Sequence, residues 1–103
     1  MSTIDTLRAR WAEFTEAARP DGLQDIDEEV DVELLVDSAS DCIESYLATG
    51  LLSARENGAL RACSVELKRI LPTVDGEAAD YLRQLADFAA QIMMRPNLPG
   101  FFG

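Results

Sequence analysis

Apolar residues recur every three or four positions in four separate stretches of this 103-residue chain. That spacing places them on one face of an α-helix, whereas no segment alternates polar and apolar residues long enough to predict a β-strand. A chain of this length suits one domain that buries roughly 60–65% of its unfolded surface. The sequence therefore predicts an all-α, four-helix bundle-like single domain over residues 1–103, built from up-down helical hairpins.

Breaks in the apolar pattern set the expected helix boundaries. Pro20 ends the first helix because proline cannot continue one, and Gly50 suits a left-handed residue after the second. Ser53 and Glu56 have the spacing of a capping box, so a third helix starts there and forms an antiparallel hairpin with the second. We expect helices at about 3–19, 27–49, 54–71 and 76–94, followed by an irregular tail at 95–103.

Three further expectations concern burial. Trp11 belongs to the apolar stripe of the first helix and is predicted to lie in the core beside the fourth helix. Cys42 and Cys63 fall on inward faces about equally far from the hairpin turn, so they should be reduced, buried and close together. In the tail, Phe101 and Phe102 are expected to fold back over the bundle, with a docking peptide for another protein as the alternative.

The net charge of −10 comes from one part of the chain. Residues 20–54 contain ten acidic residues and no basic one, whereas the flanking segments, 1–19 and 55–103, are each balanced. This distribution disfavours binding to nucleic acid or to an anionic membrane surface. No apolar run approaches the roughly 20 residues needed to span a bilayer, so we expect a soluble, cytoplasmic protein.

The residue types disfavour most forms of catalysis. The chain has no histidine, which removes the usual base for a serine or cysteine nucleophile and a common metal ligand. A calcium loop counted from Asp25 would need glycine and glutamate where Val30 and Val36 stand. We expect no catalytic, cofactor-binding or metal-binding residues, and an enzyme based on carboxylates is a distant third hypothesis.

The acidic residues of the second predicted helix share one face, opposite its apolar side. Glu33, Asp37 and Asp41 repel one another at i,i+4 spacing by roughly 0.2–0.5 kcal/mol per pair, a small cost that a solvated surface could also carry. Asp25 and Asp27 are expected to act mainly in starting the helix. The predicted partner-binding residues are Glu29, Asp31, Glu33, Leu34, Asp37, Asp41 and Glu44.

These patterns predict a non-enzymatic protein-binding module, an acidic inhibitor or immunity-type protein. Its partner would be a basic toxin, nuclease or nucleic-acid-binding enzyme, docked through the second helix. The layout is similar to that of colicin immunity proteins in size, acidity and helix order. Those proteins carry an Asp-x-Ile-Tyr-Tyr-Pro motif where this chain has Leu51-Leu52-Ser53, so no residue roles are transferred. The alternative is a helical adaptor or oligomeric scaffold; either way, we expect a monomer or weak homodimer.

Overall fold

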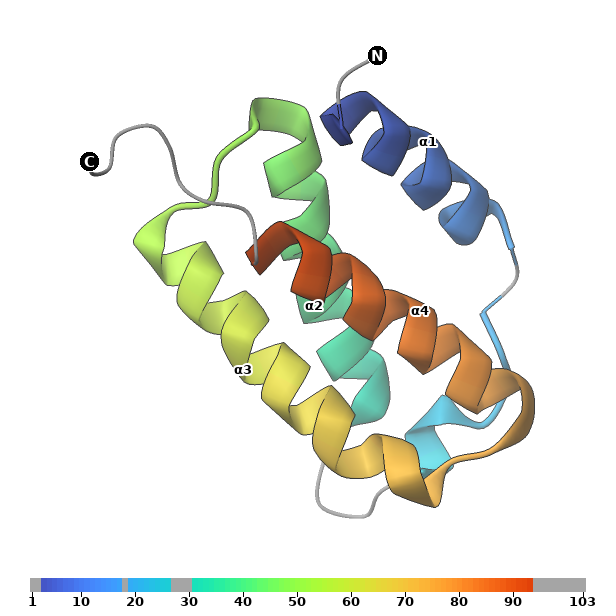
Figure 1. The fold of residues 1–103 in the computed structure, drawn as a ribbon. Helices are drawn as coiled ribbons and strands as arrows, with labels where there is room; N and C mark the ends of the chain where they lie inside the picture. The colour runs from blue at the N-terminus through green and yellow to red at the C-terminus, as the bar shows by residue number, and fades with distance from the viewer. Residues whose placement is uncertain (1–2, 18, 27–30, 94–103) are drawn as a thin grey trace.

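The computed structural model describes residues 3–17, 19–26 and 31–93, which form four packed α-helices and no strand (Figure 1). The all-α prediction is confirmed. Across these residues, no helix is both long and apolar enough to cross a membrane. The helices are α1 (Thr3–Glu16), α2 (Val32–Thr49), α3 (Ala54–Ile70) and α4 (Gly76–Met93), with short 3-10 turns at η1 (Leu23–Asp25) and η2 (Leu71–Thr73).

Helices α2, α3 and α4 each pack against the other two, and α1 lies along the edge of this group (Figure 1). Their facing sides supply the core because apolar area removed from water stabilises a fold by about 25 cal/mol per Å². Trp11 is buried and its ring meets Phe88 of α4 edge-on at 5.0 Å, which confirms the predicted position of Trp11. The largest fully buried side chains include Leu7, Ile43, Leu60, Leu67, Ile70, Leu82 and Leu85.

The turn between α2 and α3 has the predicted geometry. Gly50 adopts φ 81°, and its N–H donates to the carbonyl of Tyr46. The capping box is complete, since the Glu56 N–H donates to Ser53 Oγ at 3.1 Å and the Ser53 N–H donates to Glu56 Oε1 at 3.0 Å. A hydrogen bond from Ser45 and those at Ser53 lower the pKa of Glu56. The turn is thus held by charge-assisted bonds.

Helix α2 starts later than predicted, at Val32 instead of about residue 27. Asp31 is its N-cap and accepts a hydrogen bond from the Leu34 N–H at 3.1 Å. Before it, the fully buried Leu23 holds the chain in the turn η1, which contains Asp25. The prediction that Asp25 starts α2 is therefore wrong, and Asp27 lies outside the described residues.

Helix α1 ends at Glu16, three residues earlier than predicted. Pro20 keeps Arg19 out of the helix, since the residue before a proline is disfavoured in helical conformation. Arg19 instead reaches across to Asp37 of α2. The other helix ends agree with the predicted bounds to within one residue.

Cys42 and Cys63 are free and buried, as predicted. Burial raises the pKa of both thiols, and the nearby Cys42 adds to the rise at Cys63. The pair therefore lies at the α2–α3 contact as protonated thiols. The tail prediction for Phe101 and Phe102 falls outside the described residues and stays a prediction.

Both thiols should react slowly with a thiol reagent in the folded protein and rapidly in denaturant, because the thiolate is the reactive form and burial disfavours it. Ellman's reagent with and without urea measures this. Rapid labelling of both cysteines under native conditions would contradict their burial.

Replacing Ser53 with alanine should lower the free energy of unfolding by about 0.5–2 kcal/mol, the usual cost of losing an N-cap. The depressed pKa of Glu56 contributes stability above its unfolded pKa of about 4.3, and this contribution is lost as the pH falls through the folded value. Ser53→Ala removes part of that depression. Urea unfolding at pH 7 and pH 3 should therefore show a smaller acid-induced loss in the variant, and equal losses would contradict the assignment.

Candidate functional site

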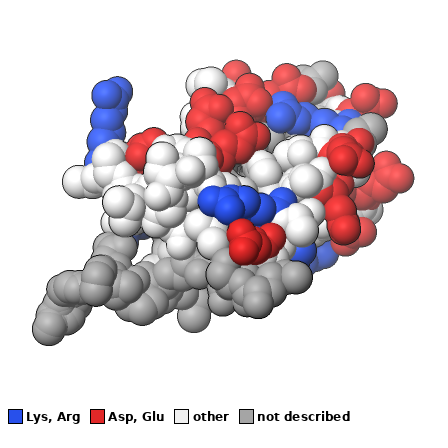
Figure 2. Space-filling model, turned by 90° about the horizontal axis from the view of Figure 1, so that it is seen from above, with Lys and Arg blue, Asp and Glu red and all other residues white. Residues whose placement is uncertain are grey.

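The outward face of α2 forms a surface that we call the acidic ribbon, made of Glu33, Leu34, Asp37 and Asp41. Leu34 is 61% exposed, which is high for a leucine, and the three carboxylates of the ribbon are exposed as well. Glu33 and Asp41 form no hydrogen bond or ion pair with any residue that the structure describes. Seen from above, the molecule has acidic side chains in broad groups and basic ones as separate islands (Figure 2).

Three of the predicted residues, Asp31, Asp37 and Glu44, have partners within the fold. Asp37 accepts from Arg19 at 3.1 Å, and Glu44 accepts from the Trp11 indole N–H at 3.3 Å. Asp31 is used as the N-cap of α2. Glu29 falls in a gap of the described ranges. The structure therefore brings Glu33, Leu34, Asp37 and Asp41 together as one surface and places Glu44 against α1.

Arg19 ties the acidic ribbon to α4. Burial lowers the pKa of its guanidinium, but its hydrogen bonds to Tyr81 and Asp37 and the charge of Asp37 outweigh this and leave the pKa raised. One cation therefore contacts α2 and α4 at once, just after α1 ends. Asp37 is the one carboxylate of the ribbon with a positive partner among the described residues.

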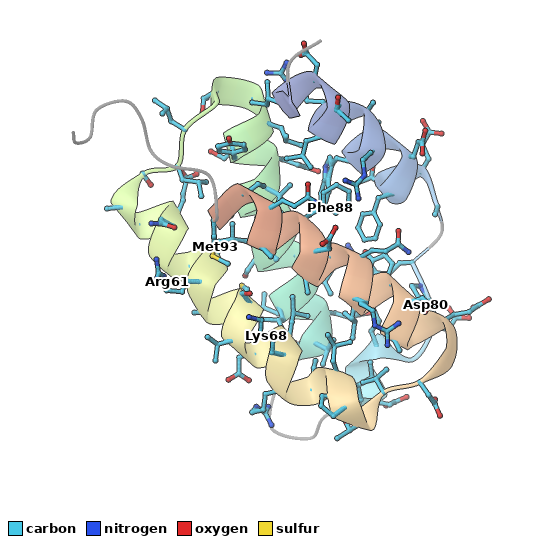
Figure 3. All side chains as sticks on the ribbon, in the orientation of Figure 1. Arg61, Lys68, Asp80, Phe88 and Met93 are labelled. Carbon is cyan, nitrogen blue, oxygen red and sulfur yellow. The ribbon has the colours of Figure 1, made fainter. Side chains whose placement is uncertain are left out.

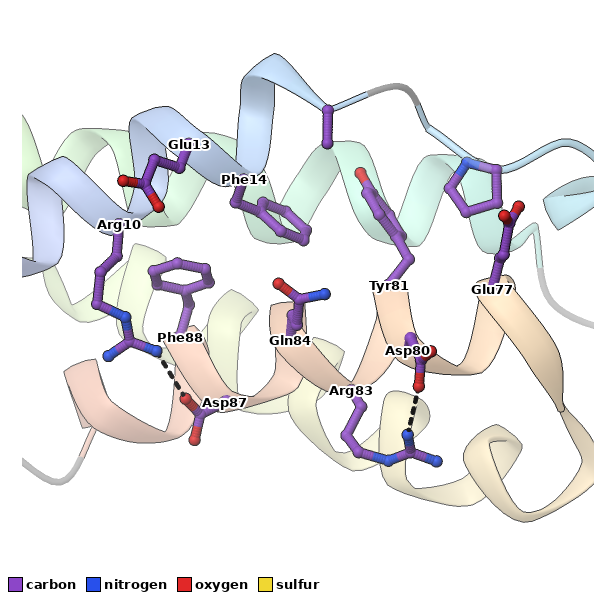
Figure 4. A pocket seen from close by; sticks show the side chains of 12 residues that line it. Arg10, Glu13, Phe14, Glu77, Asp80, Tyr81, Arg83, Gln84, Asp87 and Phe88 are labelled. Carbon is purple, nitrogen blue, oxygen red and sulfur yellow. Dashed lines mark hydrogen bonds and ion pairs between the residues drawn. The ribbon is translucent and has the colours of Figure 1, made fainter.

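A groove of about 880 Å³ runs between α1 and α4 (Figure 4). Its floor is aromatic: Phe14 stacks on Tyr81 with ring centroids 4.8 Å apart and also meets Phe88 at 5.5 Å. Trp11 lies against both phenylalanines at 5.0–5.3 Å. Such pairs add roughly 0.5–1.5 kcal/mol each beyond their buried area, so this cluster attaches α1 to the bundle.

Charged side chains form the rim of this groove. Arg10 of α1 lies 3.5 Å from Asp87 of α4, with its guanidinium carbon 5.5 Å from the centre of the Phe88 ring. Arg83 pairs with Asp80 at 3.0 Å (Figure 4). The other two rim carboxylates, those of Glu13 and Glu77, are drawn without any interaction to the residues around them.

A second hollow, of about 580 Å³, lies beside the α2–α3 turn. It contains Asp41, Arg55 and Glu56, with the nearly buried Cys42 at its wall. Because the pKa of Cys42 is raised, its thiol is a poor nucleophile at neutral pH. Over the described ranges, no three Asp, Glu or Cys side chains gather in a way that suits a metal ion.

The sequence did not reveal the groove. Its α4 side was readable, since Glu77, Asp80, Gln84 and Asp87 recur at three- and four-residue spacing along one edge of that helix. Its α1 side was not, because nothing in the order of residues says that Arg10 and Glu13 face α4. The groove depends on the crossing of two helices that are distant in sequence.

Comparison of this chain with protein-family models, with curated proteins and with solved structures finds no match.

Replacing Phe14 with alanine should lower the free energy of unfolding by about 3–5 kcal/mol and shift the Trp11 emission to longer wavelength, because the variant loses the centre of the aromatic cluster. Chemical unfolding followed by Trp11 fluorescence measures both. Val65→Ala, at a side chain that is 59% exposed, is the matched control and should stay within about 0.5 kcal/mol of the native protein. A Phe14→Ala cost no larger than the control's would contradict the role of the cluster.

Proposed function

We propose that this protein is a non-enzymatic binding module that docks a basic protein through the acidic ribbon of α2. A toxin, a nuclease or a nucleic-acid-binding enzyme has the required positive surface. The observation that carries the proposal is the exposed Leu34 at the edge of the face that holds Glu33 and Asp41, two carboxylates that form no ion pair with a described residue.

Charge supports this function through the rate and the specificity of association. A surface of one sign steers an oppositely charged partner and can raise the association rate well above the value for neutral proteins. Because Arg19 offsets only Asp37, the ribbon stays strongly negative. The steering should weaken as salt rises, since the Debye length falls from about 10 Å at 0.1 M to about 3 Å at 1 M.

Leu34 can supply the affinity that exposed charges alone do not provide. Exposed ion pairs contribute only about 0–1 kcal/mol each, whereas buried side chains at the centre of an interface supply most of the affinity. A leucine that becomes fully covered gains about 1.5–3 kcal/mol. Leu34 lies at the edge of the carboxylate face, so a partner that docks on the acidic ribbon can cover it at the same time.

The side chains that could act in catalysis, the cysteines and carboxylates, support binding over catalysis. Burial raises the pKa of both thiols and so keeps them protonated. The sequence contains no histidine to act as a base near neutral pH. Docking of a basic partner needs only the exposed charges and Leu34, without an activated nucleophile or a base.

A helical scaffold that binds copies of itself is the second candidate, and it has its own supporting observation. Arg61 and Lys68 lie on α3 (Figure 3) with the 59% exposed Val65 between them in sequence. Neither cation pairs with a carboxylate of the described part of the chain. A basic α3 surface on one copy is complementary to an acidic ribbon on another.

The test compares native protein with a Glu33→Lys, Asp41→Lys variant. The native protein should retain one basic protein at one-to-one stoichiometry from a cell extract at low salt, and release it at high salt. For the purified pair, the variant should associate at least roughly tenfold more slowly at low salt, with a weaker salt dependence. Light scattering of the purified protein measures its mass and so distinguishes binding to a basic partner from self-association.

The matched control carries the same change in charge elsewhere, as Glu16→Lys with Asp21→Lys, both at exposed positions outside α2. It should slow association far less than the ribbon variant. Equal effects would show that total charge matters and the ribbon does not. Circular dichroism of each variant checks that the helices are intact.

A further inference from the structure

We propose that the groove between α1 and α4 is a guanidinium-binding site that receives an arginine side chain of the basic partner, and that the chain's own Arg10 occupies part of it. This inference rests on the proposed function and deepens it by naming a side chain that the partner inserts. It concerns a different surface from the acidic ribbon.

Arg10 shows that the groove is suited to a guanidinium. Its guanidinium group lies over the Phe88 ring, 5.5 Å from the centroid, and 3.5 Å from the Asp87 carboxylate (Figure 4). An aromatic face combined with a carboxylate is the environment that a planar, delocalised cation prefers. Arg10 is itself half exposed, so it can leave this position without unfolding α1.

The rest of the groove offers the same chemistry. Glu13 on α1 and Glu77 on α4 are exposed rim carboxylates, and both lack a drawn partner in the close view (Figure 4). Between them lie Phe14 and the half-buried Tyr81, stacked at 22° between their planes. Two free carboxylates beside aromatic rings favour a cation over an anion or a neutral group.

The dimensions fit a side chain presented by an extended segment. The groove follows α4 from Glu77 to Phe88, eleven residues or about 16 Å at 1.5 Å per residue. Its volume of about 880 Å³ lies within the range of 300–1,000 Å³ that is usual for ligand sites. An extended chain of about five residues spans that length at about 3.3 Å per residue.

The test titrates the full chain with a blocked Gly-Arg-Gly peptide and follows amide chemical shifts and Trp11 fluorescence. Trp11 is the only tryptophan and contacts the groove floor at Phe14 and Phe88. Saturable shifts should map to the facing sides of α1 and α4. The same peptide with neutral citrulline should give none, and a lysine peptide should bind several-fold more weakly.

Two variants make the assignment specific. Arg10→Ala should strengthen binding of the arginine peptide roughly two- to fivefold, because it frees Asp87 and the Phe88 face; a purely structural role of Arg10 predicts the opposite sign. Arg61→Ala removes the same charge on α3, away from the groove (Figure 3), and should give a smaller gain.

The converse variant, Glu13→Gln with Glu77→Gln, should weaken binding roughly two- to fivefold for each carboxylate removed. Its control is Glu16→Gln with Asp25→Asn, which removes two exposed carboxylates elsewhere and should have little effect.

Binding of the citrulline or lysine peptide as tight as that of the arginine peptide would overturn the guanidinium assignment. So would shifts that map to the acidic ribbon, or the absence of saturable shifts up to the solubility limit of the peptide. These results need no partner protein, so they are separable from the proposed function. If the arginine peptide does not bind the groove but the protein still retains a basic partner through the acidic ribbon, the groove inference is wrong and the proposed function stands.

Discussion

The outer carboxylates of α2 cannot be buried, and the positions of the other helices follow from that constraint. An ionised carboxylate moved from water into an apolar interior without a partner costs several kcal/mol. Helices α3 and α4 therefore pack against the opposite, apolar side of α2, where Val36 and Ile43 are fully buried. The acidic ribbon is the side left facing water.

Helix α1 and the segment that follows it place hydrogen-bond donors against α2. Arg8 donates to the Leu47 carbonyl at 2.7 Å, Trp11 to Glu44, and Arg19 to Asp37. Each contact gives a polar group of α2 a partner, and Phe14 supplies the apolar attachment on the α4 side. Helix α1 and the segment after it thus give partners to polar groups of α2, and α1 also forms a wall of the groove.

The acidic ribbon and the groove are connected through the segment that follows α1. Arg19 contacts both Asp37 of the ribbon and Tyr81 of the groove floor, and Pro20 lines the groove beside it. A basic partner that covers both surfaces would combine rapid, salt-dependent association at the ribbon with a more enclosed contact at the groove. A partner that binds the ribbon alone would show the salt-dependent association without the enclosed contact, and a partner that binds the groove alone would show the reverse.

The sequence by itself determined the local structure, because helix formation depends on residues three and four positions apart. It predicted the helical class, the Ser53–Glu56 capping box, the turn at Gly50 and the burial of Trp11 and both cysteines. It misplaced the start of α2 because burial of Leu23, a tertiary effect, fixes the preceding turn. Only the tertiary structure decided which carboxylates have partners and where the groove lies, since Arg19 meets Asp37, and Arg10 meets Asp87, across distances that no local pattern encodes.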